Sequence, residues 1–186
     1  MRREIRAGAV VLRKFEAAFA PLLWEAATTA CSPPFTYFAP WCQPGYSLAD
    51  SKQVIAQSEA DWQAGTAFQF AVFRASTGEL CGGIGLKQPN LTPGLYNLGY
   101  WVGPAWQRRG IARLATGQVA RAAFADLPPL HRLEILTMPD NVASQRTALA
   151  AGATREGLLR QRLRVGDAWH DALLFSLVRA DVAAAT

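Results

Sequence analysis

The sequence has few cysteines and no long apolar run. Only three of its 186 residues are cysteines, and the spacing of Cys31, Cys42 and Cys81 fits neither a disulfide framework nor a zinc site. Cys31 and Cys42 could pair in principle, but free thiols are the simpler interpretation. No stretch approaches the ~20 apolar residues that cross a bilayer, and charged Met1–Arg6 lacks the apolar segment of a signal peptide. These absences predict a cytoplasmic protein with no membrane contact and no metal.

Charged residues are also scarce, at 18% of the chain, whereas 51% of the residues are hydrophobic. This composition excludes a disordered chain and provides a sizeable core. The length predicts one domain over residues 1–186, with a core at about 5–180. The net charge is +5, from three Lys and sixteen Arg against fourteen acidic residues. Such a balance suits any polyanion, from nucleic acid to a phosphorylated cofactor, and does not choose among them.

The hydrophobic pattern predicts an α/β fold, with a mixed sheet covered by helices. Helical spacing occurs at Phe15–Trp24 and again from Ser47 or Asp50 to Trp62, with Gly65 as the stop. Between these helices, Ser32–Gly45 is rich in proline and aromatic residues, which is typical of a substrate-facing loop. No strand is expected before the first helix.

Six strands and two helices are expected in the rest of the chain, and the first two strands should form a hairpin. The expected strands are Phe68–Phe73, Leu80–Leu86, Asn97–Val102, Leu133–Thr137, Thr154–Val165 and Trp169–Val178, and the helices are Gly110–Ala125 and Asn141–Ala151. On the fifth of these strands, spacing by two predicts that Arg160, Arg162 and Arg164 share one face. Such a stripe would suit RNA or an acidic peptide, and a solvated face is the ordinary alternative.

The most informative segment is Gly99–Ala112, where a strand ends at Val102 and a helix begins near Gly110. The first turn of a helix leaves backbone N–H groups unpaired and carries partial positive charge. Gly110 has no side chain to block an approaching ligand, and Arg108 and Arg109 add positive charge. The segment therefore predicts a seat for a diphosphate. The alternative is a plain strand-to-helix connection with solvated arginines.

Four segments in order along nearly the whole chain resemble one enzyme family. Gln107–Ala112 is similar to the Gln/Arg-x-x-Gly-x-Gly/Ala signature with which GCN5-related N-acetyltransferases (GNATs) hold the pyrophosphate of acetyl-coenzyme A. Pro139–Arg146 and Ala151–Gly157 resemble the Asn-x-x-Ser and Gly-hydrophobic-x-x-Glu-Gly patterns of the RimJ/RimL-type subfamily, which acetylates N-terminal amines of ribosomal proteins. Gly78–Leu86 resembles the central hairpin of that subfamily, and the region of Trp41 its substrate-side loop.

The resemblance implies a single-domain GNAT fold, mostly antiparallel, with acetyl-coenzyme A as cosubstrate. The strand ending at Val102 would splay from the strand near Leu133, and the pantetheine arm would lie in the gap as an added strand. A backbone N–H near Val102 would stabilise the oxyanion of the thioester. The residues implied to bind the cofactor are Trp101, Val102, Gln107, Arg108, Arg109, Gly110, Ile111, Ala112, Asn141 and Arg146.

The catalytic residues implied are Ser144 and Glu134. Ser144 lies three residues after Asn141, on the same helical face, and would protonate the leaving thiolate or hydrogen-bond to the sulfur. The ordinary alternatives are an N-cap for Asn141 and a surface hydroxyl for Ser144. Glu134 is a candidate base, with pairing to a nearby arginine as its alternative. The glutamate that many relatives carry before the Gly-Tyr of the third strand is absent from Tyr96–Tyr100.

The implied reaction is direct attack of an amine on the acetyl thioester, with Trp41 and Tyr100 binding the substrate. The alternative for Tyr100 and Trp101 is that one is a core residue and the other a surface aromatic. An α-amine, with a pKa of ~8, loses its proton more readily than a lysine near ~10.4, which favours a protein or peptide N-terminus as the acceptor. Association with the ribosome and a homodimer are compatible with this acceptor. The alternatives are a small amine, such as an aminoglycoside, polyamine or amino-acid-like antibiotic, and a non-catalytic acyl-CoA-binding or RNA-associated module.

Overall fold

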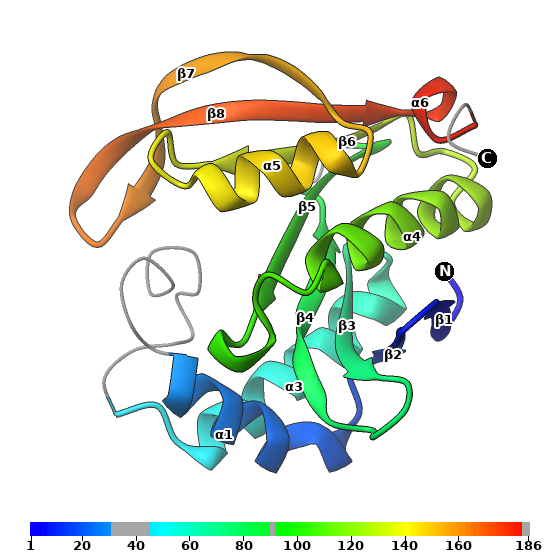
Figure 1. Cartoon of the computed structure of the whole chain (residues 1–186), viewed down its shortest axis with the longest axis vertical. Helices are drawn as coiled ribbons and strands as arrows, with labels where there is room; N and C mark the ends of the chain where they lie inside the picture. The colour runs from blue at the N-terminus through cyan, green and yellow to red at the C-terminus, as the bar shows by residue number, and fades with distance from the viewer. Residues whose placement is uncertain (31–44, 90–91, 184–186) are drawn as a thin grey trace.

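A computed structural model describes residues 1–30, 45–89 and 92–183, which form one eight-stranded sheet in the order β1-β2-β3-β4-β5-β6-β8-β7 (Figure 1). Neighbouring strands are antiparallel except for β5 and β6, which confirms a mixed, mostly antiparallel sheet. The strands are β1 (Glu4–Ala7), β2 (Val10–Lys14), β3 (Ala67–Arg74), β4 (Leu80–Lys87), β5 (Leu95–Val102), β6 (Arg132–Thr137), β7 (Thr154–Val165) and β8 (Ala168–Val178).

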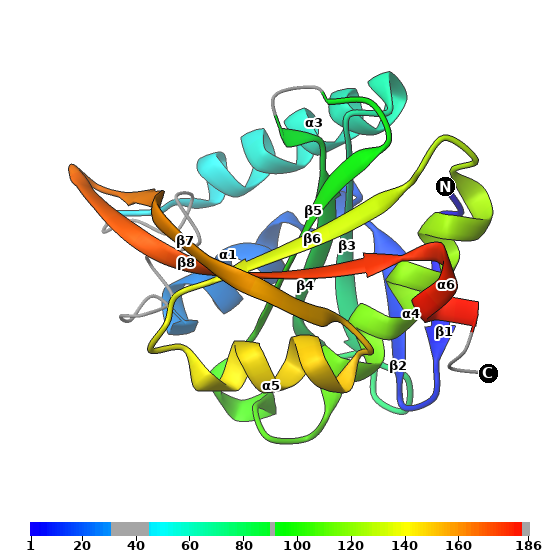
Figure 2. The same ribbon diagram turned by 90° about the horizontal axis from the view of Figure 1, so that it is seen from above.

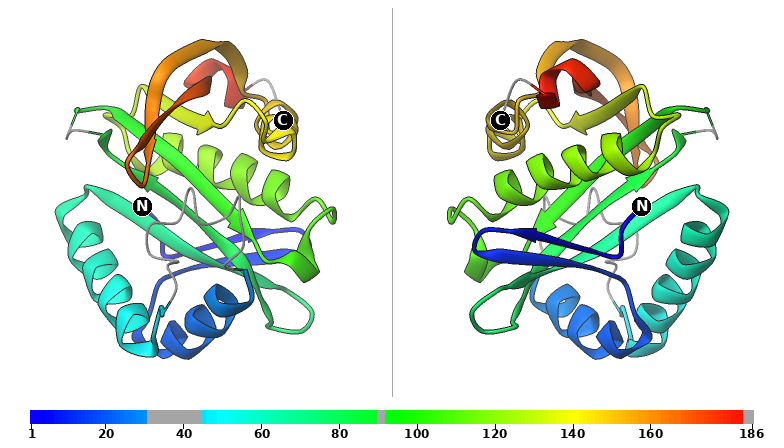
Figure 3. Two further views of the ribbon diagram at one scale, coloured as in Figure 1. Left: turned by 90° about the vertical axis from the view of Figure 1, so that its left-hand side faces the viewer. Right: turned by 90° about the vertical axis from the view of Figure 1, so that its right-hand side faces the viewer.

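Helices cover both faces of the sheet. Figures 2 and 3 show α1 and α3 on one face and α4 and α5 on the other. The helices are α1 (Ala20–Ala30), α3 (Leu48–Ala64), α4 (Ile111–Asp126), α5 (Val142–Ala150) and α6 (Arg179–Ala183), with 3-10 turns η1 (Ala17–Phe19) and η3 (Pro104–Trp106). Within the described residues, none of these helices is long and apolar enough to cross a bilayer.

The ends of α3 lie where the sequence predicts them. The Ser47 hydroxyl accepts from the backbone N–H of Asp50, and the Asp50 carboxylate accepts from the backbone N–H of Ser47, which completes a capping box. At the other end Gly65 adopts φ 71°, a left-handed conformation that glycine takes without steric cost. Both signals are local, so the sequence alone predicts this helix well.

The main core lies between the sheet and α4. Ile111, Ala115, Val119 and Ala122 are all buried on one stripe of α4. They pack with the alternate residues of the strands, such as Leu98 of β5, in one cluster. Because most of this stripe is alanine or valine, the helix can lie close to the sheet.

The sequence prediction misses the hairpin of β1 and β2 at one edge of the sheet. Ile5 and Ala7 are buried and their neighbours are exposed, and the turn passes through Gly8 at φ 56°. Two alternations in a four-residue strand give too little periodicity to identify it. Lys14 at the end of β2 is buried and forms an ion pair with Glu59, which ties this hairpin to α3.

The predicted arginine stripe on β7 is wrong. The pairing of β7 with β8 shifts register between Leu159 and Leu163, and Gln161 in between has φ 48°. This irregularity breaks the alternation of side chains that would place three arginines on one face. Arg160, Arg162 and Arg164 are all exposed, which fits the alternative of a solvated face.

Candidate acetyl-transfer site

Strands β5 and β6 pair at one end and diverge at the other (Figure 1). Their parallel pairing covers only Leu95–Asn97 against Arg132–Glu134, although β5 continues to Val102 and β6 to Thr137. On its other side β5 stays paired with β4 up to Val102. The last five residues of β5 therefore present an unpaired strand edge toward the gap, as the family resemblance implies.

The turn that follows β5 carries backbone donors without acceptors. Arg108 has φ 60° and Gly110 φ 74°, and the first intrahelical bond of α4 runs from the Leu114 N–H to the Gly110 carbonyl. Among the described residues, no backbone or side-chain acceptor takes the N–H groups of residues 108–113. A Cβ on Gly110 would have open space around it. Successive N–H groups in such a turn form a concave anion site at the positive end of a helix.

Arginines surround this turn. The guanidinium of Arg109 lies 5.1 Å from the centre of the Trp106 ring, and that of Arg74 lies 5.6 Å from the same ring. Arg108 is exposed beside them. The Gln107 side-chain amide donates to the Val102 carbonyl at 3.4 Å, which ties the turn to the end of β5. Sequence analysis misses Arg74, because it reaches the turn only through the pairing of β3 and β4.

Helix α5 lies across the gap from β5 and begins at an asparagine cap. The Asn141 Oδ1 accepts from the backbone N–H of Ser144 at 3.0 Å, so the alternative role of Asn141 as N-cap is confirmed. The Tyr100 hydroxyl donates to the Ser144 carbonyl at 3.0 Å and lies 3.1 Å from the Ser144 Oγ. Burial raises the pKa of Tyr100, so its hydroxyl keeps its proton at neutral pH.

Comparison with known proteins identifies the family. The family described as "Acetyltransferase (GNAT) domain" matches residues 9–154, which is well over half of the chain. The chain belongs to the GNAT acetyltransferases. It is therefore an enzyme of the acyltransferase class, and the turn between β5 and α4 lies within the matched residues.

Three proteins show how this GNAT chain relates to others. It is 28% identical over 138 residues to the ribosomal-protein-serine acetyltransferase of Escherichia coli, covering 74% of this chain and 75% of that protein. The structure of a putative ribosomal-protein-serine acetyltransferase from Vibrio cholerae has 29% identity and a TM-score of 0.80, covering 96% of this chain and 99% of that one. RimL, a ribosomal α-N-protein acetyltransferase in complex with coenzyme A, has 19% identity and a TM-score of 0.83, covering 94% and 97%, and shows the shared fold.

Glu134 of this GNAT chain lies where the pairing of β5 and β6 ends, opposite Asn97. The Arg132 guanidinium donates to Glu134 at 2.9 Å and also pairs with Glu156, whose carboxylate accepts from Ser176. These bonds hold the pKa of Glu156 well down, at about 2. Glu134 is thus paired with an arginine, as its alternative role predicts. The structure does not bring Glu134 together with Ser144.

The other predicted site residues divide among the turn, α5 and the opposite sheet face. Ile111 is buried, Ala112 is half-buried in the first turn of α4, and Arg146 is exposed on α5. Trp101 is half-buried and packs with the cluster under α1 and α3, on the face opposite to Tyr100. Trp41 lies outside the described residues.

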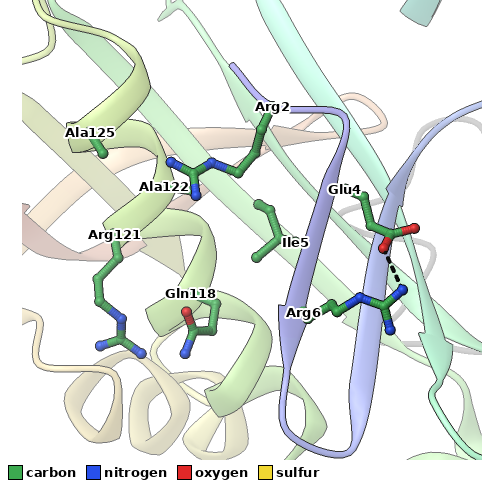
Figure 4. Close-up of a pocket in the computed structure, with 8 residues that line it drawn as sticks. All are labelled: Arg2, Glu4, Ile5, Arg6, Gln118, Arg121, Ala122 and Ala125. Carbon is green, nitrogen blue, oxygen red and sulfur yellow. Dashed lines mark ion pairs between the residues drawn. The ribbon is translucent and has the colours of Figure 1, made fainter.

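A cavity of about 300 Å³ lies between β1 and the C-terminal half of α4 (Figure 4). Two of its cations are already paired, Arg2 with Asp126 and Arg6 with Glu4. Neither β5 nor α5 contributes to its lining. It is therefore separate from the acetyl-transfer site.

Proposed function

We propose that this enzyme transfers the acetyl group of acetyl-coenzyme A to the α-amine of a protein or peptide N-terminus. The observation that supports it most is the combination of an unpaired β5 edge with a donor-rich turn at its end. The acceptor is inferred from the named substrates of the E. coli and V. cholerae proteins. Such an acceptor would place the enzyme in the cytoplasm, in contact with ribosomal proteins.

The residues of the turn fit the diphosphate of coenzyme A. The N–H groups of residues 108–113 would donate to phosphate oxygens, and the open space beside Gly110 admits them. Arg108, Arg109 and Arg74 supply positive charge around the turn. The amide-rich pantetheine chain would extend the sheet along the unpaired edge of β5, because each of its amides can bond to a strand as a peptide does.

Bound there, acetyl-coenzyme A supplies an activated acyl group that an amine can attack directly. The backbone at Val102, where β5 ends, would donate to the thioester oxygen as it gains charge, an effect worth ~3 kcal/mol for one donor. The Ser144 hydroxyl would donate a hydrogen bond to the sulfur as the C–S bond breaks, and the thiolate would then take up from water a proton equivalent to the one that the amine loses. The Tyr100 hydroxyl, which stays protonated, would hold Ser144 in place from across the gap.

The absence of a carboxylate next to Gly99 also favours an α-amine. No carboxylate stands in Tyr96–Tyr100, and Glu134, which lies opposite Asn97, is paired with Arg132. An amine with a pKa of ~8 is partly neutral at cellular pH and needs little help, whereas a lysine side chain near ~10.4 needs a strong base. We expect water to take the proton.

The release of coenzyme A across a panel of acceptors tests this proposal. The panel contains serine-initiated peptides with free N-termini, the same peptides with acetylated N-termini, polyamines and aminoglycosides. We expect release to be much faster with the free peptides than with the polyamines and aminoglycosides, and absent with the acetylated peptides. Faster release with a small amine would assign the alternative substrate class. Tight binding of acetyl-coenzyme A with no release for any amine would make the chain a binding module.

A further inference from the structure

One row of three residues crosses the sheet on the face of α1 and α3. Gln69 of β3 pairs with Gly85 of β4, and Gly85 pairs with Gly99 of β5. On this face a Cβ at Gly85 would lie 2.0 Å from the Gln69 Oε1. Glycine at position 85 therefore lets the Gln69 side chain lie flat across β4, with its amide directed along the row.

The row ends in open space. A Cβ at Gly99 would meet no atom of the described residues within 4 Å, and Gly99 is exposed although it lies in the middle of β5. The neighbouring row is different, because a Cβ at Gly83 would lie 2.5 Å from the Trp101 indole nitrogen. Trp101 thus forms one wall beside Gly99. Beyond Gly99 lies the unpaired edge of β5 that opens to the gap.

Two half-buried amides border this space without hydrogen-bond partners. No hydrogen bond of the Gln69 or Asn97 side chain is found among the residues that the structure describes. Asn97 lies two residues before Gly99, so its side chain is on the same face of β5. Polar side chains away from bulk solvent are normally hydrogen-bonded to protein or to water, so two amides without a protein partner around an open space leave donors and acceptors that a polar ligand can take in place of water.

We propose that Gln69 and the bare backbone at Gly99 form a subsite for the main chain of the acceptor peptide, just after its α-amine. A side-chain amide offers one acceptor oxygen and an NH₂ donor, which match the N–H and C=O groups of a peptide backbone. A polyamine or aminoglycoside has no peptide group to match. This inference rests on the proposed function and deepens it, because it explains how the enzyme distinguishes a peptide from a small amine.

Gln69→Leu tests the subsite, since it keeps the volume over Gly85 and removes both hydrogen-bonding groups. The acceptors are a serine-initiated tripeptide and ethanolamine, which has an amine but no peptide group. We expect kcat/KM for the tripeptide to fall about tenfold, mainly through KM, with little change for ethanolamine or for the Kd of acetyl-coenzyme A. Gln53→Leu, on the exposed side of α3, is the matched control.

Gly99→Ala tests the open space independently. The new methyl group meets no atom of the described part of the chain within 4 Å, and Gly99 does not need a left-handed backbone, so folding should be unaffected. We expect the KM for the tripeptide to rise at least fivefold. Gly157→Ala on β7 also meets no atom and should leave the KM unchanged. Gln69→Glu, which keeps the size of the side chain but loses its donor, replaces Gln69→Leu if the latter does not fold.

The two proposals fail in different ways. If the wild-type enzyme acetylates the tripeptide and both variants keep its preference over ethanolamine, the subsite is wrong and the proposed function stands. If the wild-type enzyme binds acetyl-coenzyme A but acetylates no peptide, the proposed function is wrong and the subsite fails with it.

Discussion

The hydroxyl of Tyr100 connects β5 to α5 across the gap, with 3.0 Å to the carbonyl of Ser144 and 3.1 Å to its hydroxyl. Both ends of this contact lie at the splay, where β5 has lost its pairing with β6. The hydroxyl of Ser144 is thus fixed by a neighbour that keeps its proton, because burial raises the pKa of Tyr100. A fixed, uncharged hydroxyl beside the gap suits a donor to a leaving thiolate.

Ser144→Ala should lower kcat more than it weakens binding of acetyl-coenzyme A. We expect a loss of at least tenfold in kcat with a Kd within twofold of wild type, because the hydroxyl matters only as the sulfur leaves. Steady-state kinetics and calorimetry measure the two quantities. Leu149→Ala, at an exposed position near the end of the same helix, is the control. Equal effects on kcat and Kd would reduce Ser144 to a binding residue.

Tyr100→Phe should act through Ser144. The variant keeps the ring in its partly buried place and removes only the hydroxyl that bonds to Ser144. We expect kcat to fall about three- to tenfold. In the double variant with Ser144→Ala the two losses should combine to less than their product, since they remove one shared interaction. Multiplicative losses would show that the two residues act separately.

Gly110→Val should weaken acetyl-coenzyme A binding by tenfold or more. Valine at φ 74° strains the backbone and places a branched side chain in the space beside the donors. Gly78→Val is a close control, because Gly78 has φ 73°, has the same open surroundings and lies in the turn between β3 and β4. The two variants should lose similar stability on thermal melting. Equal affinity in both would contradict the proposed diphosphate seat.

Gly82→Ala should destabilise the fold by about 1–3 kcal/mol. A Cβ at Gly82 would lie 2.2 Å from the Trp101 carbonyl oxygen, and backbone cannot move aside as a flexible side chain can. The strain would separate β4 from β5 at Val102, its partner in the pairing. Urea unfolding measures the change, and Gly157→Ala should show almost none. Equal stability of Gly82→Ala and Gly157→Ala would contradict this prediction, because it would show that β4 and β5 can move apart at no cost.

Asp126 should make stability depend on pH only under acidic conditions. The Arg2 side chain donates to its carboxylate and lowers its pKa to about 2. A carboxyl whose pKa is lower in the folded than in the unfolded state stabilises the fold above the unfolded value of ~3.9. This contribution is lost as the pH falls from there to about 2. Asp126→Asn should therefore melt below wild type at pH 7 and level with it at pH 2, whereas a constant difference would point to packing instead.

The sequence predicts the elements whose signals are local and misses those that depend on tertiary structure. The capping box at Ser47 and the glycine stop at Gly65 fix α3 from a few adjacent residues. The β1 strand is too short to show a period, and the register shift around Gln161 follows from how β7 pairs with β8. Local pattern cannot reveal either feature.

The candidate site divides in the same way. The turn at Gly110 is a continuous motif, so the sequence predicts its free donors. By contrast, the contact of Tyr100 with Ser144 joins residues 44 positions apart, and Arg74 reaches the turn from another strand. The row from Gln69 to Gly99 likewise exists only once three strands are in register.

The position of the transferred acetyl group tests the central claim most directly. A serine-initiated peptide that also contains one internal lysine is incubated with the enzyme and acetyl-coenzyme A, and the product is sequenced by tandem mass spectrometry. We predict one added acetyl group on the α-nitrogen of serine and none on the lysine. Acetylation of the lysine alone, or an unmodified peptide after prolonged incubation with folded enzyme, would contradict the account.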